Sequence, residues 1–290
     1  DTVFWRIYNG LDIRRLNCLD KNNNVPPKGT HLKILVDGHD SMFHGKDALG
    51  IVGTKPKDGS HRAFKYLCAF SDYDPKGIVA IAELFDGSVT ETTQELIEEL
   101  RKDYPIDIVI VDGEFYKAEF IKYLIDAKIN FVTRRTDTGN IRELHIPYNK
   151  PYLYAKDVER KDGRIIHLKY WLYRYKGKDR DFYLASNMCK NARDMRKLYK
   201  TRWHIETGFR EVNRVKIKTT TRDFLVRLFF YIVSCIIYNL WQKIRFRYSM
   251  FTVRFVEIIA AVKEYIQTSL FDAFDIMMNR RLRHIRLRFW

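Results

Sequence analysis

The chain has 290 residues, of which 46% are hydrophobic, so it can bury the core of one large domain or two small ones, and a disordered main state is excluded. Lysine and arginine total 52 against 36 acidic residues, which gives a formal net charge of +16. This excess predicts a polyanionic partner, with nucleic acid first and an anionic membrane surface second.

Residues 1–30 are predicted to be a lead-in or linker. The stretch 21–29 is rich in asparagine, proline and glycine, which sustain neither a helix nor a strand. The chain begins with Asp1, and no signal-like apolar segment follows. We therefore expect residues 1–30 to be the remnant of an upstream region.

The next part, residues 31–133, has the element order of an α/β domain. Three apolar segments separated by turn formers predict an antiparallel meander, over 31–37, 63–70 and 78–84. A capping-box pattern from Thr92 to Glu95 predicts the start of a helix. Further strands are expected over 106–111 and 129–133, with a helix over about 115–127 between them. This order predicts a mixed sheet flanked by helices.

Residues 134–186 are rich in tyrosine, alternate in polarity and carry three turn signals, which predicts a β-rich insertion. Residues 187–246 are predicted to be helical, with helices over about 194–216 and 224–246. The longest apolar run in this part has eleven residues, and a membrane span needs about 20, so we expect a core helix and no membrane association. Residues 247–290 are predicted to be a helical, basic tail.

Two aspartates each follow an apolar strand and precede a glycine: Asp37 and Asp112. One such pair alone commonly only begins a turn. Two of them at strand ends of one α/β sheet favour a ligand site, because ligand-facing residues collect at such ends.

A third group lies on the first predicted helix of residues 187–246. Tyr199, Arg202 and Glu206 are spaced three or four apart, so they share one helix face, which Arg210 and Asn213 extend. The alternative is an exposed face with an Arg202–Glu206 ion pair worth about 0.3–0.5 kcal/mol. Apolar neighbours on the same helix favour packing on a core, and hence a functional face.

Three carboxylates brought together repel one another unless a cation neutralises them. Oxygen ligands suit Mg²⁺ or Mn²⁺, and two such ions can assist cleavage or transfer of a phosphodiester.

The segments 34–38 and 109–115, with the pattern Tyr-x2-Arg-x3-Glu at Tyr199, Arg202 and Glu206, resemble the IS4-type transposases of bacteria and archaea. The resemblance covers residues 31–246, approximately.

The resemblance implies a ribonuclease H-like fold with a β-rich insertion between the second aspartate and the glutamate. It also implies that Asp37, Asp112 and Glu206 are the catalytic residues and bind Mg²⁺, with Mn²⁺ as a substitute and two ions in the site. DNA contacts are expected from six residues: Tyr199, Arg202, Trp203, Arg210, Asn213 and Lys216.

Two of these DNA-contact assignments have alternatives. Trp203 could stack on a base flipped out of the duplex, or it could be a core aromatic. The family pattern has lysine seven residues after the glutamate, and Asn213 stands there. Arg210 or Lys216 could supply the missing positive charge.

The function implied is cut-and-paste DNA transposition by a homodimer on DNA, through cleavage at transposon ends and strand transfer. The four cysteines form no CxxC pair, so we expect a reducing cytoplasm, which the resemblance implies is that of a bacterium or archaeon. No P-loop spacing is present, so we expect no nucleotide cofactor. Three alternatives remain: a non-catalytic DNA-binding derivative, a metal-dependent nuclease without strand transfer, and a basic RNA-binding or scaffold protein.

Overall fold

The computed structural model describes residues 26–84, 88–136, 141, 143–160, 162–216, 219–247, 257, 260 and 264. The chain falls into two compact units, residues 1–243 and 244–290. Of the predicted lead-in, only 26–30 lie within the described residues. The arginine-rich stretch 279–288 of the predicted tail lies outside them.

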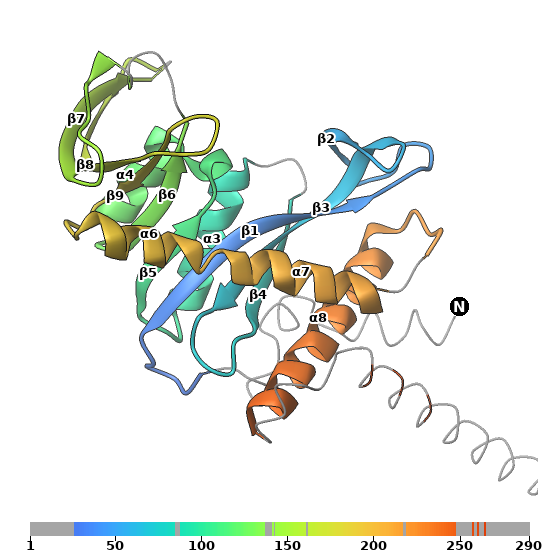
Figure 1. The fold of residues 1–290 in the computed structure, drawn as a ribbon. Coiled ribbons are helices and arrows are strands. Elements are labelled where there is room, and N and C mark those ends of the chain that lie inside the picture. The colour runs from blue at the N-terminus through green and yellow to red at the C-terminus, as the bar shows by residue number, and fades with distance from the viewer. Residues whose placement is uncertain are drawn as a thin grey trace, which may run out of the picture. The chain divides into compact units, whose positions relative to one another are not determined.

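One nine-stranded mixed sheet forms the centre of the first unit, in the order β2-β3-β1-β5-β6-β9-β8-β7, with β4 also paired to β3 (Figure 1). The α/β fold with a mixed sheet is thereby confirmed. The pairs β1–β5 and β5–β6 are parallel, and the others are antiparallel. The strands are β1 (Leu32–Met42), β2 (Val52–Lys57), β3 (Ser60–Ser71), β4 (Ile78–Leu84), β5 (Ile106–Val111), β6 (Asn130–Arg135), β7 (Pro151–Glu159), β8 (Ile165–Tyr175) and β9 (Phe182–Ser186).

Helices cover both faces of this sheet (Figure 1). On one face, α3 (Val89–Arg101) and α4 (Ala118–Asp126) bury leucine, isoleucine and phenylalanine side chains in the main core. On the other face lie α6 (Ala192–Lys200), α7 (Trp203–Val215) and α8 (Phe224–Arg247). Residues 34–36 of β1 and 109–111 of β5 are apolar and fully buried on both faces, as expected for parallel strands covered on both sides.

Two predictions about the meander are wrong. The first strand continues past Gly38 to Met42, because its pairing with β3 runs on to the Met42–Ala63 pair. Between the first two predicted segments, where only turn formers were expected, lies strand β2, which pairs with β3 through a tight hairpin. Its turn residues, Asp58 and Gly59, both have positive φ, 51° and 78°, as a two-residue hairpin loop requires.

Helix boundaries also differ from the prediction. The first helix begins at Val89 because the Ser88 side chain accepts a hydrogen bond from the backbone N–H of Thr90, so the predicted capping box at Thr92 lies inside the helix. The long helix predicted over 194–216 is two helices, α6 and α7, separated by a turn at Thr201 and Arg202. A short 3₁₀ turn, η1 (Gly113–Phe115), precedes α4.

The strands β7, β8 and β9 fall within the predicted insertion, residues 134–186. They extend the central sheet, because β9 pairs antiparallel with β6. This pairing continues one sheet from the strands around Asp37 and Asp112 to the far end of the insertion. The insertion therefore shares backbone hydrogen bonds with β6, which in turn pairs with β5, the strand that ends just before Asp112.

Helix α8 is, within the described residues, the one helix whose length and mean hydropathy of 1.8 meet the requirement for crossing a membrane; half of that span is buried inside the protein. Its side chains also bond to the sheet. The Tyr231 hydroxyl lies 3.2 Å from Cys68 Sγ, and the Asn239 side chain bonds both the N–H and the C=O of Ile78. These contacts are those of a helix packed on a sheet.

Candidate active site

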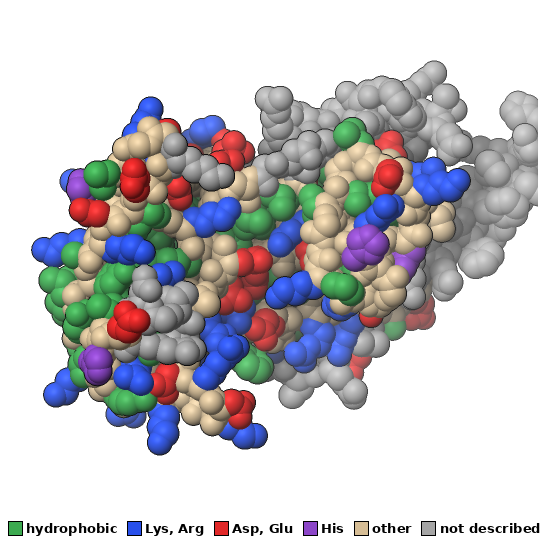
Figure 2. Space-filling view, turned by 90° about the horizontal axis from the view of Figure 1, so that it is seen from above, with side chains coloured by type: hydrophobic (Ala, Val, Ile, Leu, Met, Phe, Trp, Pro, Cys, Tyr) green, Lys and Arg blue, Asp and Glu red, His purple; other side chains and the backbone are tan. Residues whose placement is uncertain are grey.

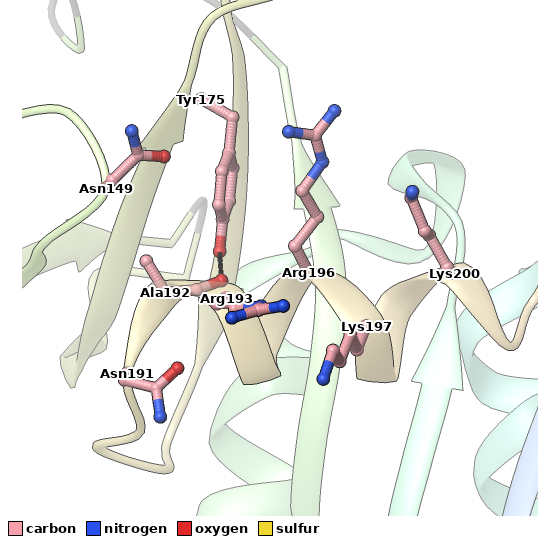
Figure 3. A pocket seen from close by; sticks show the side chains of 8 residues that line it. All are labelled: Asn149, Tyr175, Asn191, Ala192, Arg193, Arg196, Lys197 and Lys200. Carbon is pink, nitrogen blue, oxygen red and sulfur yellow. Dashed lines mark hydrogen bonds between the residues drawn. The ribbon is translucent and has the colours of Figure 1, made fainter.

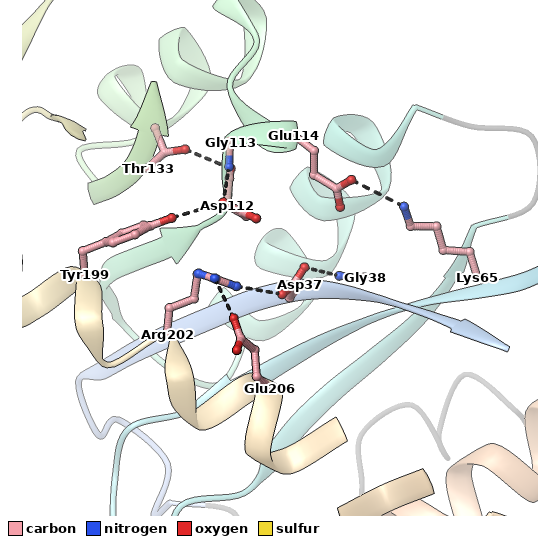
Figure 4. Close-up of polar contacts among 10 residues, drawn as sticks. All are labelled: Asp37, Gly38, Lys65, Asp112, Gly113, Glu114, Thr133, Tyr199, Arg202 and Glu206. Atoms are coloured by element: carbon pink, nitrogen blue, oxygen red, sulfur yellow. Dashed lines mark hydrogen bonds and ion pairs between the residues drawn. The ribbon is translucent and has the colours of Figure 1, made fainter. Parts of the chain in front are cut away.

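Two neighbouring parallel strands bring the first pair of carboxylates together: Asp37 lies within β1, and Asp112 directly follows β5. Val36 of β1 pairs with Val111 of the parallel strand β5, so the next residues, Asp37 and Asp112, lie side by side. Each carboxylate accepts a hydrogen bond from the backbone N–H of the glycine that follows it, at 2.8 Å for Asp37 and 2.7 Å for Asp112 (Figure 4). The repeated Asp-Gly pattern thus fixes both side chains in the same way.

The turn between α6 and α7 supplies the opposite side of the site. The Tyr199 hydroxyl donates to Asp112 Oδ1 at 3.1 Å. The guanidinium of Arg202 donates from Nη1 to Asp37 Oδ2 at 3.3 Å and from Nη2 to Glu206 Oε1 at 2.8 Å (Figure 4). The structure therefore brings these five predicted residues into one cluster, with Arg202 between Asp37 and Glu206.

Burial dominates the electrostatics of Asp37. It raises the pKa of the carboxyl to about 6, although the Gly38 N–H and Arg202 favour the charged form; neighbouring Asp112 and Glu114 raise it further. Burial also raises the pKa of Tyr199, and the Asp112 charge adds to this, so its phenol stays protonated and available as a donor.

Burial acts against the charge of Arg202. Its neighbours Tyr199, Asp112, Asp37 and Glu206 outweigh that cost and raise the pKa of the guanidinium. Arg202 is therefore a fixed positive charge in the middle of three carboxylates. The three carboxylates therefore form a negatively charged environment that already holds one cationic side chain, Arg202.

The donor set fits a hard divalent cation, because all three side chains present carboxylate oxygens. Within the described part of the chain, no three acidic, histidine or cysteine side chains already stand at metal-binding spacing. The Arg202 guanidinium lies between two of the carboxylates instead. A bound cation at Asp37 and Glu206 would replace Arg202 as their partner.

Three further residues border the cluster and were not predicted. Glu114 directly follows Gly113, and its carboxylate lies 3.7 Å from the ammonium of Lys65 on β3. A Cβ on Gly38 would lie 2.6 Å from Lys65 Cε, so this glycine leaves room for the lysine. Thr133 on β6 donates to the Asp112 carbonyl at 3.0 Å. Glu114 stood inside the recognised segment 109–115, but Lys65 and Thr133 reach the site only through sheet pairing.

The remaining predicted DNA-contact residues lie along α7 and at its end. Trp203 is 63% exposed, so the core-aromatic alternative is wrong. Arg210 and Asn213 are exposed, and Asn213 lies beside the buried His39. Lys216 donates to Ser41 Oγ at 2.7 Å, four residues beyond Asp37 along β1, and burial lowers its pKa to about 8. The roles of these side chains on DNA stay predictions.

A family model described as a transposase DDE domain matches residues 28–240. The chain is a member of this family. The match confirms the predicted resemblance at the level of DDE transposases, whereas the IS4 type stays a prediction. No curated protein matches this transposase chain.

Among solved structures, the transposase is similar to a piggyBac transposase in a synaptic complex with hairpin DNA. The TM-score is 0.56 at 16% sequence identity, over 75% of this chain and 47% of the other. The transposase thus spans about half the length of that protein. The likeness is one of fold, and it agrees with the predicted ribonuclease H-like arrangement.

Figure 2 shows one face of the transposase with acidic side chains gathered near its middle and lysine and arginine side chains around them. This distribution suits a polyanion whose flanking parts contact the lysine and arginine side chains and whose middle part lies at the carboxylates. The net charge of +16 adds a long-range attraction for such a ligand.

Proposed function

We propose that this chain is the transposase of an IS4-type insertion sequence, which cleaves DNA at transposon ends and joins the freed ends to target DNA. The observation that supports it most is the convergence of Asp37, Asp112 and Glu206 on one guanidinium, Arg202, within a DDE transposase domain. The similar piggyBac transposase is in complex with hairpin DNA, which supports DNA as the substrate.

In this proposal Asp37, Asp112 and Glu206 hold two divalent cations, Mg²⁺ or Mn²⁺. Bound there, such ions supply activation of the attacking oxygen and stabilisation of the leaving oxygen. Arg202 exchanges its carboxylate partners for the negatively charged oxygens of the DNA phosphate, which a guanidinium binds in a bidentate manner. Tyr199, protonated and held on Asp112, orients that carboxylate and offers a donor to the DNA strand end.

The reaction needs no covalent bond between protein and DNA. Water attacks the phosphorus at the transposon end, the 3′ oxygen leaves as a hydroxyl, and that hydroxyl then attacks a phosphodiester of the target strand. Each step exchanges one phosphodiester oxygen for another at the same cluster of carboxylates. We expect a homodimer on DNA to carry out both steps in the cytoplasm of a bacterium or archaeon.

One observation favours a second candidate, a non-catalytic DNA-binding derivative. Asn213 stands where the family pattern has lysine, and it lies beside His39. The charge that Asn213 lacks is expected from Arg210 or Lys216, which lie on the same helix and at its end. A metal-dependent nuclease without strand transfer differs from the main proposal only in the second step.

The test compares the wild-type chain with Asp112→Asn and Glu206→Gln, which keep side-chain size while removing a charge. A supercoiled plasmid with Mg²⁺ or Mn²⁺ reports nicking, and a labelled oligonucleotide with a free 3′ end reports joining to the plasmid. Loss of a single metal-binding carboxylate is expected to lower cleavage by about a hundredfold or more. Duplex binding should stay within about twofold of wild type, since phosphate contacts do not depend on these acids.

Glu91→Gln, an exposed acid on α3, is the matched control and should cut as the wild type does. Cleavage that survives in both variants would contradict the proposed site. A wild-type chain that binds DNA but never cuts it would favour the non-catalytic derivative, and cutting without joining would favour the nuclease.

A further inference from the structure

A second basic site lies outside the carboxylate cluster, in a pocket of about 580 Å³ at the beginning of α6 (Figure 3). We name it the α6 pocket. Six of its lining residues carry the argument: Tyr175, Asn191, Arg193, Arg196, Lys197 and Lys200. None of them is needed to hold Asp37, Asp112 or Glu206 in place.

The four cations of the α6 pocket share one face of α6. Positions 193, 196, 197 and 200 follow the spacing i, i+3, i+4 and i+7, and all four side chains are exposed. In the described part of the chain, none of the four has an acidic partner. The helix's one acid, Asp194, is bound to the capping residue Asn191. These charges are therefore available to a ligand.

Lysines on the other face of the sheet differ in this respect. Lys102 is paired with Glu99, and Lys122 on α4 is paired with Asp126. Each of these two lysines is thus neutralised by an acid three or four positions away. The α6 pocket differs from them, because its four cations share one helix face without an acidic partner among the described residues.

The pocket is built rather than open surface, because the insertion forms its other wall. The Tyr175 hydroxyl at the end of β8 donates to the Ala192 carbonyl at 2.7 Å and fixes the start of α6. The Arg196 guanidinium lies 5.7 Å from the Tyr175 ring centroid and 5.6 Å from that of Phe182. Such cation–π contacts hold an arginine in place and reduce the entropy lost when it binds an anion.

The lining of the α6 pocket ends one residue along the chain from a side chain of the candidate active site. Lys200 is adjacent to Tyr199, whose hydroxyl bonds Asp112. From Arg193 to Lys200 the helix rises about 10.5 Å at 1.5 Å per residue. This row of cations is therefore long enough to meet more than one phosphate of the same DNA strand.

We propose that the α6 pocket binds the phosphodiester backbone of the DNA strand beside the cleaved bond, and so fixes the path of that strand into the active site. The proposal rests on the proposed function for the nature of the substrate. Arginine and lysine contacts to phosphate position DNA without reading its sequence. A free polyphosphate would offer the same chemistry, and the experiment separates the two sources.

The test is Arg193→Ala/Lys197→Ala in the full chain, measured by fluorescence anisotropy on a labelled 30-bp duplex without metal. Each lost phosphate contact lowers the slope of log K against log salt by about 0.9, so we expect the slope to fall by about 1.8 and the Kd at low salt to rise about tenfold or more. Lys102→Ala/Lys122→Ala removes the same charge from α3's end and α4 and should leave the slope at its wild-type value.

A second double variant, Lys197→Ala/Lys200→Ala, repeats the test. Thermal melting shows whether each variant folds, so that a folding defect in one of them leaves the other to decide the outcome. Wild-type slope and Kd in the folded pocket variants would overturn the proposal. Loss of inorganic tripolyphosphate binding with unchanged duplex binding would overturn it in favour of a free polyphosphate.

Because binding is measured without metal, failure of the proposed function is a separate result. If the wild-type chain never cuts DNA but the pocket variants show the expected decrease in the slope of log K against log salt, the α6 pocket is still supported as a site for the DNA backbone. Conversely, a chain that cuts with an unaltered slope in the pocket variants keeps the catalytic proposal and loses this one.

Discussion

At the scale of single residues, Arg202 determines the state of the active site. Its guanidinium bonds Asp37 and Glu206 and lies close enough to Asp112 for that charge to raise its pKa. Arg202 therefore offsets part of the repulsion between these acids, although Asp112 still raises the pKa of Asp37. The same arrangement leaves Asp37 buried and costly to ionise.

The raised pKa of Asp37, about 6, predicts a pH-dependent cost in stability. The folded state holds the proton more tightly than the unfolded state, so this stabilising contribution is fully present below about pH 3.8 and is lost as the pH rises through 6. Asp37→Asn removes the ionisation. At pH 7.5 with chelator, we expect the variant to be more stable than wild type by up to about 3 kcal/mol.

Chemical denaturation at pH 7.5 and pH 4 measures this difference. The advantage of Asp37→Asn should shrink toward zero at pH 4. A variant that is less stable than wild type by the same amount at both pH values would show that the Arg202 contact outweighs burial.

The pKa of Asp72 is lowered, so its effect on stability depends on pH in the opposite direction to that of Asp37. Asp72 forms ion pairs with Lys33, Lys76 at 3.2 Å and His204 at 3.6 Å, and these partners lower its pKa despite the opposing effect of burial. Its contribution to stability is therefore present above about pH 3.8 and is lost as the pH falls below that value. Asp72→Asn is expected to lower the free energy of unfolding by about 2–3 kcal/mol at pH 7.

Urea denaturation of the Asp72→Asn variant at several pH values tests this. Its deficit should narrow as the pH is lowered from 4 toward 2. Asp157→Asn, an exposed partner of His167, serves as control and should cost less than about 1 kcal/mol. An equal deficit at every pH would contradict the assignment.

At the scale of elements, the position of α7 depends on its close approach to β3. Gly208 lies two residues after Glu206 and packs against Phe70, whose ring would be 2.4 Å from an added Cβ. A larger side chain there would push α7 away from the sheet. The Glu206 carboxylate would move with it.

Gly208→Ala is therefore expected to destabilise the protein by about 1–3 kcal/mol, although alanine normally favours a helix by about 1 kcal/mol. The proposed cleavage activity should fall as well. Thermal melting and the plasmid nicking assay measure both effects. Gly53→Ala is the control, because a Cβ there meets nothing within 4 Å; equal melting temperatures for the two variants would contradict the packing argument.

The periodicity of apolar residues predicted most of the helices and strands, but not those whose formation depends on contacts with residues distant in the sequence. β2 was missed because its polar residues look like a loop, although the Asp58-Gly59 turn carried a hairpin signal. The helix start at Ser88 could have been found from its side chain, and the competing pattern at Thr92 misled the prediction. Strand β1 extends past Gly38 only because β3 provides a partner.

The site itself was predictable in part. Asp37, Asp112 and Glu206 were predicted to lie together because two Asp-Gly pairs follow apolar segments and a spaced pattern marks a helix; Asp37, however, lies within β1 and not at its end. Lys65 could not be found in this way, since only the antiparallel register of β3 places it over Gly38. The position of Arg202 between Asp37 and Glu206 could not be predicted from the sequence either. Helix spacing relates Arg202 to Glu206, but the contact with Asp37 depends on the tertiary fold.

At the scale of the whole molecule, a net charge of +16 governs how DNA is approached. With 6–10 phosphate contacts, affinity for a duplex of arbitrary sequence should fall by about 10³–10⁵ between 50 and 200 mM salt. Anisotropy titrations at four salt concentrations measure this. Asp112→Asn should give the same slope, because its carboxylate contributes no phosphate contact, and a salt-independent affinity would contradict a backbone-bound DNA.

The sheet's outer strands bear on how copies of this chain can meet. At one border, Pro56 interrupts the donors of β2, and the Asn239 amide occupies both the N–H and the C=O of Ile78 in β4. At the other border, β7 carries Lys156 and Asp157. Proline, charge and capped backbone groups discourage strand addition. We therefore expect the proposed dimer on DNA to form through helices, loops or the DNA itself rather than by pairing of sheet edges.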